Sequence, residues 1–244
     1  MTKKKSDKIE IDKNSSECVI GMLDRIPKPP EILLKKIGLN PPAYGTYPNY
    51  LETDDKPPKA IDDRTEIFPI DECLGLYKPD EREIIIFNKG IDKASEIIDC
   101  NPLYLKYIVK IHEWSHALIH LGLNLDERNK MNRDDNYREE RLKNLTSVYK
   151  SFGTKLDEHL AQLLTHYSLQ QLENDSTSKD GRKMIGAYKE TFKKLNKHQP
   201  SKYRIGDFLE AEGVTQDRVI ESIRLLRKGW LKGIFDAWSI VIKW

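Results

Sequence analysis

The feature that most constrains this chain is a helical, largely apolar stretch that contains the pattern His-Glu-x-x-His at residues 112–116. Two histidines four residues apart lie one turn apart on the same helix face, so both imidazoles can reach one metal ion. Glu113 is rotated by about 100° from His112, which places its carboxylate beside a metal-bound water and off the metal. Zinc activates water in such an arrangement, with a carboxylate as general base. The pattern therefore predicts a zinc site on His112 and His116, with Glu113 as catalytic base.

The sequence around this pattern predicts a helix with its own start and stop. Asn101 supplies an N-cap, and Pro102 suits the first helical position. The helix is expected to run over residues 103–121 and to end near Gly122. Apolar residues occur at helical spacings on more than one side, which predicts a buried helix. The alternative interpretation is a chance match, or a hydrogen-bonded pair of core histidines.

A catalytic zinc needs a third protein ligand and an open position for water. His120 continues the same face, but a continuous helix places it about 12 Å from His112. We therefore interpret it as a core histidine or as a support for the ligands. Glu158 is the better candidate, because it begins an apolar helix in which the small Ala161 permits close approach to a neighbouring helix. The alternative for Glu158 is a surface glutamate favoured by the helix dipole. The other candidates for the third ligand are Asp157, His159 and His120.

The composition is typical of a globular protein with some polar segments. Charged residues make up 33% of the 244 residues, and hydrophobic residues make up 38%. No apolar run approaches the roughly 18 residues of a membrane span, and no apolar segment of a secretory signal follows the lysine-rich start. The three cysteines are odd in number and far apart, which predicts reduced thiols. We therefore expect a cytoplasmic protein without a membrane partner.

The chain divides into four predicted segments. Residues 1–26 are polar and mixed in charge, which predicts a mobile tail. Residues 27–65 hold most of the prolines and predict an irregular segment. Residues 66–175 contain the metal pattern and are expected to form the catalytic core. Residues 180–244 are expected to form a basic helical unit.

A small antiparallel sheet is expected beside the metal-binding helix. Residues 73–77 and 82–87 predict two strands, with turn-forming residues between them. Residues 65–70 predict a third strand, which Pro69 would confine to an edge. The free edge of such a hairpin can hold an extended peptide by backbone hydrogen bonds.

The remaining segments are expected to form one surface loop and four helices. The highly charged residues 124–136 predict a surface loop. The predicted helices cover residues 92–99, 137–151, 154–172 and 182–195. The predicted fold class is α+β: a mostly helical core with a β-hairpin next to the metal-binding helix, plus a C-terminal helical unit.

The two predicted motifs together resemble a known family. His112-Glu113-x-x-His116 with the downstream Glu158-x-Leu-Ala resembles the gluzincin zinc metallopeptidases. The order of hairpin, zinc helix and glutamate helix is also similar to the compact cytosolic members, including the ImmA/IrrE-like group. The resemblance covers roughly residues 70–172, with an additional helix between His116 and Glu158. It implies a zincin-like core, Zn²⁺ bound by His112, His116 and Glu158, and hydrolysis of a peptide or protein substrate.

Two further questions follow from this reading. An oxyanion needs an additional electrophile, for which His166, Tyr167 and His120 are the candidates.

Residues 181–244 carry a net charge of +7, and residues 205–220 are compatible with a helix-turn-helix. The alternative function is therefore a nucleic-acid-binding or regulatory protein with a structural or vestigial metal site. A lysine-rich solvated helical surface explains the same charge, and we favour it over nucleic-acid binding.

Overall fold

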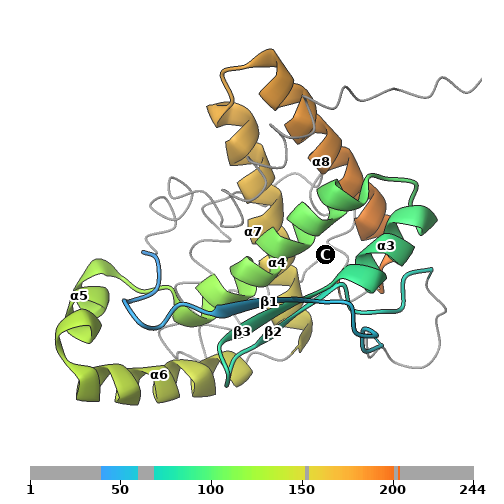
Figure 1. The fold of residues 1–244 in the computed structure, drawn as a ribbon. Coiled ribbons are helices and arrows are strands. Elements are labelled where there is room, and N and C mark those ends of the chain that lie inside the picture. Colours follow the sequence, from blue (N-terminus) through green and yellow to red (C-terminus); the bar gives the residue numbers. More distant parts are fainter. Residues whose placement is uncertain (1–39, 60–68, 152–153, 201–202, 204–244) are drawn as a thin grey trace, which may run out of the picture.

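The computed structural model describes residues 40–59, 69–151, 154–200 and 203. Within these ranges the chain is mostly helical and carries one small sheet, which confirms the α+β class (Figure 1). The predicted tail over residues 1–26, much of the proline-rich segment and the predicted helix-turn-helix lie outside the described residues. The described elements follow in the order β1 (Asn49–Thr53), β2 (Gly75–Lys78), β3 (Glu83–Phe87), α3 (Asn88–Ile97), α4 (Pro102–Leu121), α5 (Leu125–Arg133), α6 (Asp135–Lys150), α7 (Thr154–Asp175) and α8 (Lys179–His198).

The sheet has the order β1-β3-β2, with β2 antiparallel and β1 parallel to the central strand. The predicted hairpin is confirmed, since β2 and β3 pair with Leu76 opposite Ile85. Strand β3 is central because its β-branched side chains fill both faces: Ile84 and Ile86 are fully buried, and Ile85 is 8% exposed. Among the described strands, none pairs with the outer edge of β2.

The third strand differs from the predicted one. Residues 65–68 lie outside the described part, and residues 69–70 form no strand. The third strand is instead β1, from the segment predicted to be irregular. It contains no proline, so no N–H group is missing at the alternate residues whose backbone faces β3. Four of its five residues are exposed, and for this reason its sequence lacks the apolar alternation of a half-buried strand.

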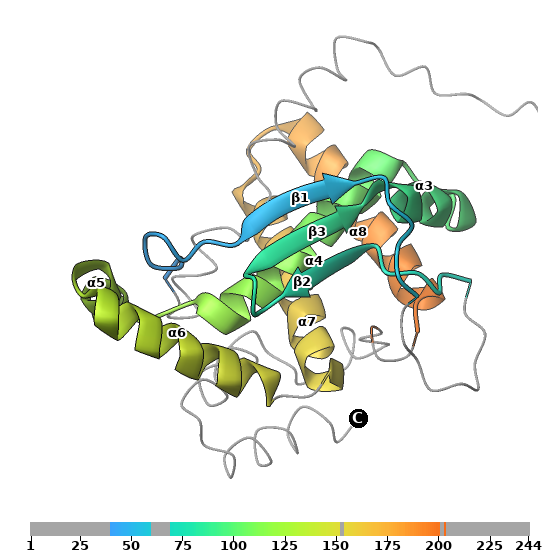
Figure 2. The same cartoon turned by 60° about the horizontal axis from the view of Figure 1, so that its bottom comes forward.

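Helix α4 confirms the expected start, length and burial. The side chain of Asn101 accepts a hydrogen bond from the Leu103 N–H group at 2.9 Å, and Pro102 occupies the first turn. Fifteen of its residues are buried, and these lie on all sides of the helix. Figure 2 shows α4 lying along one face of the sheet. Helix α7 crosses α4 on the side of α4 that faces away from the sheet. The metal pattern therefore lies between two layers.

The helices α3, α6, α7 and α8 confirm the predicted ones, with ends that differ from the predicted ends by up to four residues. The surface loop predicted over residues 124–136 is wrong, because residues 125–133 form α5. Asn124 caps this helix by accepting from the Glu127 N–H group at 2.8 Å. Acidic residues in the first turn and basic residues in the last suit the helix dipole. The fully buried Met131 anchors α5 on a small cluster with Leu145.

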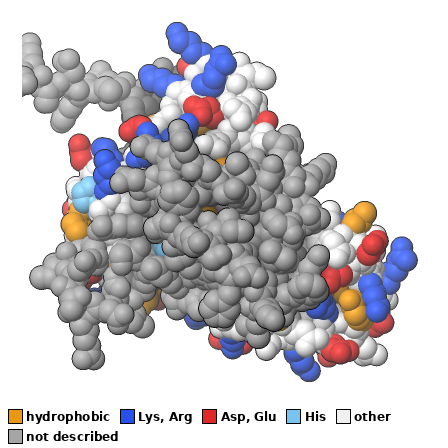
Figure 3. Space-filling model, turned by 180° about the vertical axis from the view of Figure 1, so that it is seen from behind, with side chains coloured by type: hydrophobic (Ala, Val, Ile, Leu, Met, Phe, Trp, Pro, Cys, Tyr) orange, Lys and Arg blue, Asp and Glu red, His pale blue; other side chains and the backbone are white. Residues whose placement is uncertain are grey.

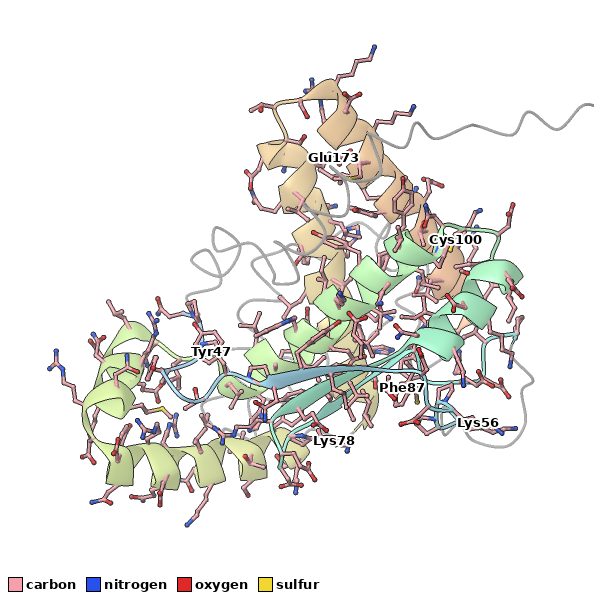
Figure 4. All side chains as sticks on the ribbon, in the orientation of Figure 1. Tyr47, Lys56, Lys78, Phe87, Cys100 and Glu173 are labelled. Carbon is pink, nitrogen blue, oxygen red and sulfur yellow. The ribbon has the colours of Figure 1, made fainter. Side chains whose placement is uncertain are left out.

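Helix α8 belongs to the same apolar core as α4, the helix that carries His112 and His116. Its buried side chains Ile185, Tyr188, Phe192 and Leu195 join the cluster that contains residues of α4 and α7. Tyr188 stacks on Tyr107 of α4, with ring centroids 4.5 Å apart. Among the described helices, none combines the length and apolar character that crossing a bilayer requires. The two described cysteines form no disulfide with each other: Cys100 lies at the turn between α3 and α4 (Figure 4), and Cys73 precedes β2.

Ion pairs attach the exposed strand β1 to α4. The Glu52 carboxylate pairs with Lys106 and, at 2.9 Å, with Lys110. Burial alone would raise the pKa of Glu52, but the two lysines outweigh it and lower the pKa to about 2. The carboxylate therefore stabilises the folded protein above its unfolded pKa of about 4.3, and this stabilisation is lost as the pH falls towards 2.

We expect Glu52→Gln to lower the free energy of unfolding by about 1 kcal/mol at pH 7, since the pair is partly exposed to solvent. The difference from wild type should shrink below pH 4 and vanish near pH 2. Urea unfolding at pH 7, 5 and 3 measures both effects. A difference that stays constant over this pH range would show that the charge of Glu52 contributes nothing.

Candidate metal centre

Three lone-pair atoms from α4 and α7 converge at one point. The Nε2 atoms of His112 and His116 are 3.1 Å apart. Glu158 Oε2 lies 3.2 Å from the first and 3.4 Å from the second. These are the three described residues that form a possible metal-binding group. Their side chains are 6 to 13% exposed, so Glu158 is not the surface glutamate of the alternative interpretation.

The triangle has the size that tetrahedral zinc needs. Zinc bonds of 2.0–2.1 Å to nitrogen and oxygen place ligand atoms about 3.3 Å apart in a tetrahedron, and the three observed separations bracket this value. A cavity of about 100 Å³ adjoins the triangle, so there is room for a water molecule at a fourth position. The donor set and its spacing therefore fit a zinc ion with an open site. No ion is present in the computed structure.

The charges of the site also favour a cation. Burial lowers the pKa of His112. Burial likewise disfavours the charged form of His116, but Asp157 and Glu158 outweigh it and raise the pKa well above the usual value. Burial alone would raise the pKa of Glu158, but His116 and His112 outweigh it and lower this pKa to about 2. Without a metal, a proton on His116 would supply the positive charge that these carboxylates require.

Glu113 lies outside the triangle and against strand β2. Its side chain is 5% exposed, and burial raises its pKa to about 8 while a hydrogen bond from the Tyr77 backbone opposes the rise. A nearby bound cation would lower this pKa again. A Cβ atom on Gly75 would lie 2.5 Å from Glu113 Oε1. The absence of a side chain at Gly75 therefore lets the carboxyl group approach the strand.

The other candidate ligands have different places. Asp157 Oδ1 lies 3.0 Å from His116 Nδ1, which is the ring nitrogen that faces away from the triangle. His120 Nδ1 lies 2.8 Å from the Tyr77 hydroxyl, and its Nε2 lies 3.0 Å from Thr146 Oγ1. This is the core position expected for His120. His159 is adjacent to Glu158 but does not belong to the metal-binding group.

Several side chains at the cavity were not found by the sequence analysis. Tyr149 lies 3.1 Å from His116 Nδ1, and Tyr203 hydrogen-bonds with Cys73. The lining of the cavity contains both tyrosines, together with Tyr77, but none of the expected oxyanion donors His166, Tyr167 and His120. His166 instead lies next to Phe192 of α8. Isolated tyrosines carry no spacing signal, so only the packing of the helices identifies them.

Comparison of the chain with models of known protein families, with curated proteins and with solved structures gives no match. The expectations about family and function therefore rest on the residues and on the geometry of the site. The following metal-binding experiment tests that geometry directly.

We expect full-length wild-type protein to retain one zinc ion after dialysis, and His116→Ala and Glu158→Ala each to lose it, because two remaining ligands hold zinc too weakly. Metal content by mass spectrometry measures this. His166→Ala, on the same helix as Glu158, is the matched control and should keep its zinc. Zinc retained in Glu158→Ala but lost in His116→Ala would exclude Glu158 as the third ligand.

Proposed function

We propose that this protein is a zinc-dependent metallopeptidase of the gluzincin type. The observation that carries the proposal is the convergence of His112 Nε2, His116 Nε2 and Glu158 Oε2 within 3.1–3.4 Å, with a cavity beside them. Three protein ligands and an open position are the arrangement of catalytic zinc, whereas structural zinc sites are closed by a fourth ligand. A purely structural metal is therefore the less favoured interpretation.

When bound, zinc would act as a Lewis acid and bring the pKa of a water molecule towards about 7. Glu113 lines the same cavity and is buried. Its carboxylate would accept the proton of the attacking water and later pass it to the leaving amine. Tyr203 also lines this cavity, and its hydroxyl group is our candidate for the donor to the oxyanion.

The substrate class follows from the free edge of β2. The Phe87 N–H group donates to the Leu74 carbonyl at 3.0 Å, so Leu74 and Leu76 direct their backbone groups to β3. The backbone groups of Gly75 and Tyr77 point the other way, towards the cavity that both residues line. The Tyr77 N–H group bonds to Glu113, so a peptide would pair with Gly75 and with the Tyr77 carbonyl group. An extended peptide can add to this edge by backbone hydrogen bonds. We therefore propose a peptide or an extended segment of a protein as substrate.

The alternative function has less support among the described residues. Helix α8 exposes basic side chains, and Figure 3 shows Lys and Arg gathered over the tip of the α7–α8 hairpin. The exposed basic residues of this helix are Lys179, Arg182, Lys183, Lys193, Lys194 and Lys197. The predicted helix-turn-helix over residues 205–220 lies outside the described part. Nucleic-acid binding therefore stays a sequence-based prediction, and we favour the peptidase.

We expect Glu113→Gln to lower kcat/KM for peptide cleavage by about 10²–10⁴-fold while zinc is retained, because the amide cannot accept the proton. The assay is mass-spectrometric detection of cleavage in a diverse peptide library, with and without a chelator. Glu173→Gln, near the far end of α7 (Figure 4), is the control and should remain active. If zinc-loaded wild type cleaves no peptide in the library, the proposed peptidase activity is wrong.

We expect Gly75→Ala to keep its zinc and to lose at least about tenfold in kcat/KM, because the new Cβ would displace the Glu113 carboxylate from β2. Gly186→Ala is the matched control, since a Cβ there meets nothing within 4 Å. Full activity of Gly75→Ala would show that the contact of Glu113 with β2 has no role in catalysis.

A further inference from the structure

His116 is held at both ring nitrogens. Its Nε2 faces His112 and Glu158 in the triangle. Its Nδ1 lies 3.0 Å from Asp157 Oδ1 and 3.1 Å from the Tyr149 hydroxyl oxygen. The side chain of His116 is 6% exposed, so water does not compete freely for either nitrogen. The orientation of this ring is therefore set by protein groups.

The hydrogen bond between Tyr149 and Asp157 determines which group donates in the contact between Tyr149 and His116. The Tyr149 hydroxyl donates its hydrogen to Asp157 Oδ2 at 2.6 Å. Its oxygen can then only accept from His116, and an ionised carboxylate has no hydrogen to donate. The hydrogen between these groups must consequently be on His116 Nδ1. This tautomer leaves the lone pair on Nε2, where a metal would bind.

The two histidines differ in this respect. His112 Nδ1 is buried and hydrogen-bonds to none of the described residues. His116 Nδ1, in contrast, hydrogen-bonds with the Tyr149 hydroxyl group and forms an ion pair with Asp157 Oδ1 at 3.0 Å. Among the described residues, protein groups hold the His112 ring at Nε2 alone, through Glu158 and His116. The His116 ring cannot rotate without breaking contacts to Asp157 and Tyr149. His116 is thus the fixed ligand of the centre.

Helix α6, the second of the two described helices between His116 and Glu158, supplies part of this support. Tyr149 lies in the last turn of α6, and Thr146 of the same helix bonds to His120. The Tyr149 ring stacks on His120, with centroids 5.0 Å apart, and meets Tyr77 edge-on at 6.0 Å. His120 in turn bonds to the Tyr77 hydroxyl. The Tyr149 ring is thus confined on two sides, which fixes its hydroxyl next to His116.

We propose that Asp157 and Tyr149 are positioning residues that act as a pair on His116 Nδ1 and hold Nε2 ready for the metal. The proposal rests on the proposed zinc site but not on peptide cleavage. It gives a role to the additional helix between His116 and Glu158, since α6 provides one member of the pair. Partners of this kind contribute about 10–100-fold to metal affinity in zinc proteins.

The test compares the zinc affinity of the full-length variants Asp157→Asn, Asp157→Ala and Tyr149→Phe by competition with a chromophoric chelator. We expect a loss of about 10–100-fold for Asp157→Ala. A smaller loss is expected for Asp157→Asn, because its amide oxygen can still accept the hydrogen bond from the Tyr149 hydroxyl group. A smaller loss is also expected for Tyr149→Phe, because the Asp157 carboxylate stays in place. The absorption spectrum of the cobalt-loaded protein should change in the same order. The matched controls are Asp175→Asn at the other end of α7 and Tyr107→Phe in the core.

Wild-type affinity and cobalt spectra in Asp157→Ala and Tyr149→Phe would overturn the proposal, even if both variants unfold at a lower temperature. If Asp157→Ala does not fold, Asp157→Asn and Tyr149→Phe decide the question. Zinc binding by wild type without any peptide cleavage would refute the proposed activity and leave this proposal intact. Absence of zinc from wild type would refute both.

Discussion

The structure depends on the close approach of three lone-pair atoms that repel one another unless a positive charge lies between them. Two imidazole nitrogens and a carboxylate oxygen within 3.4 Å are stable only with a proton or a metal at their centre. Apolar packing of α4 against α7 sets their separation. Ala161 is fully buried at this contact, and its small side chain lets the two helices approach. The hydrophobic core therefore provides the energy that holds the polar centre together.

The sheet complements this centre from the other side of α4. Its central strand is buried, and it pairs with β2, whose outer edge contacts no other strand in the described part of the chain. Gly75 removes the side chain that would separate this edge from Glu113. The same helix thus presents His112 and His116 to α7 and the buried carboxyl group of Glu113 to β2. The 3.6-residue period of the helix allows this division between neighbouring positions.

Local signals in the sequence predicted the elements whose ends depend on neighbouring residues alone. Asn101 and Pro102 mark the start of α4, and a turn-forming segment followed by a β-branched run marks the hairpin. The sequence analysis missed β1 because an exposed edge strand carries no apolar pattern. It missed α5 because charged residues were interpreted as a loop, although Asn124 caps a helix there. Strand β1 depends on its pairing with the distant β3, which its own composition does not specify. Helix α5, in contrast, carries local signals in its cap and its terminal charges, and the loop interpretation overlooked them.

The sequence by itself determined that His112 and His116 share one face of a buried helix, because the four-residue spacing and the cap are local properties. It also indicated Glu158 as the third ligand, from the position of a carboxylate at the start of an apolar helix. Only the tertiary structure decided that Glu158 reaches the two histidines and that Asp157 reaches the opposite nitrogen of His116. The positions of Tyr149, Gly75 and Tyr203 around the same cavity were likewise decided by packing, since residues this far apart in the chain meet only when the helices and the sheet close on one core.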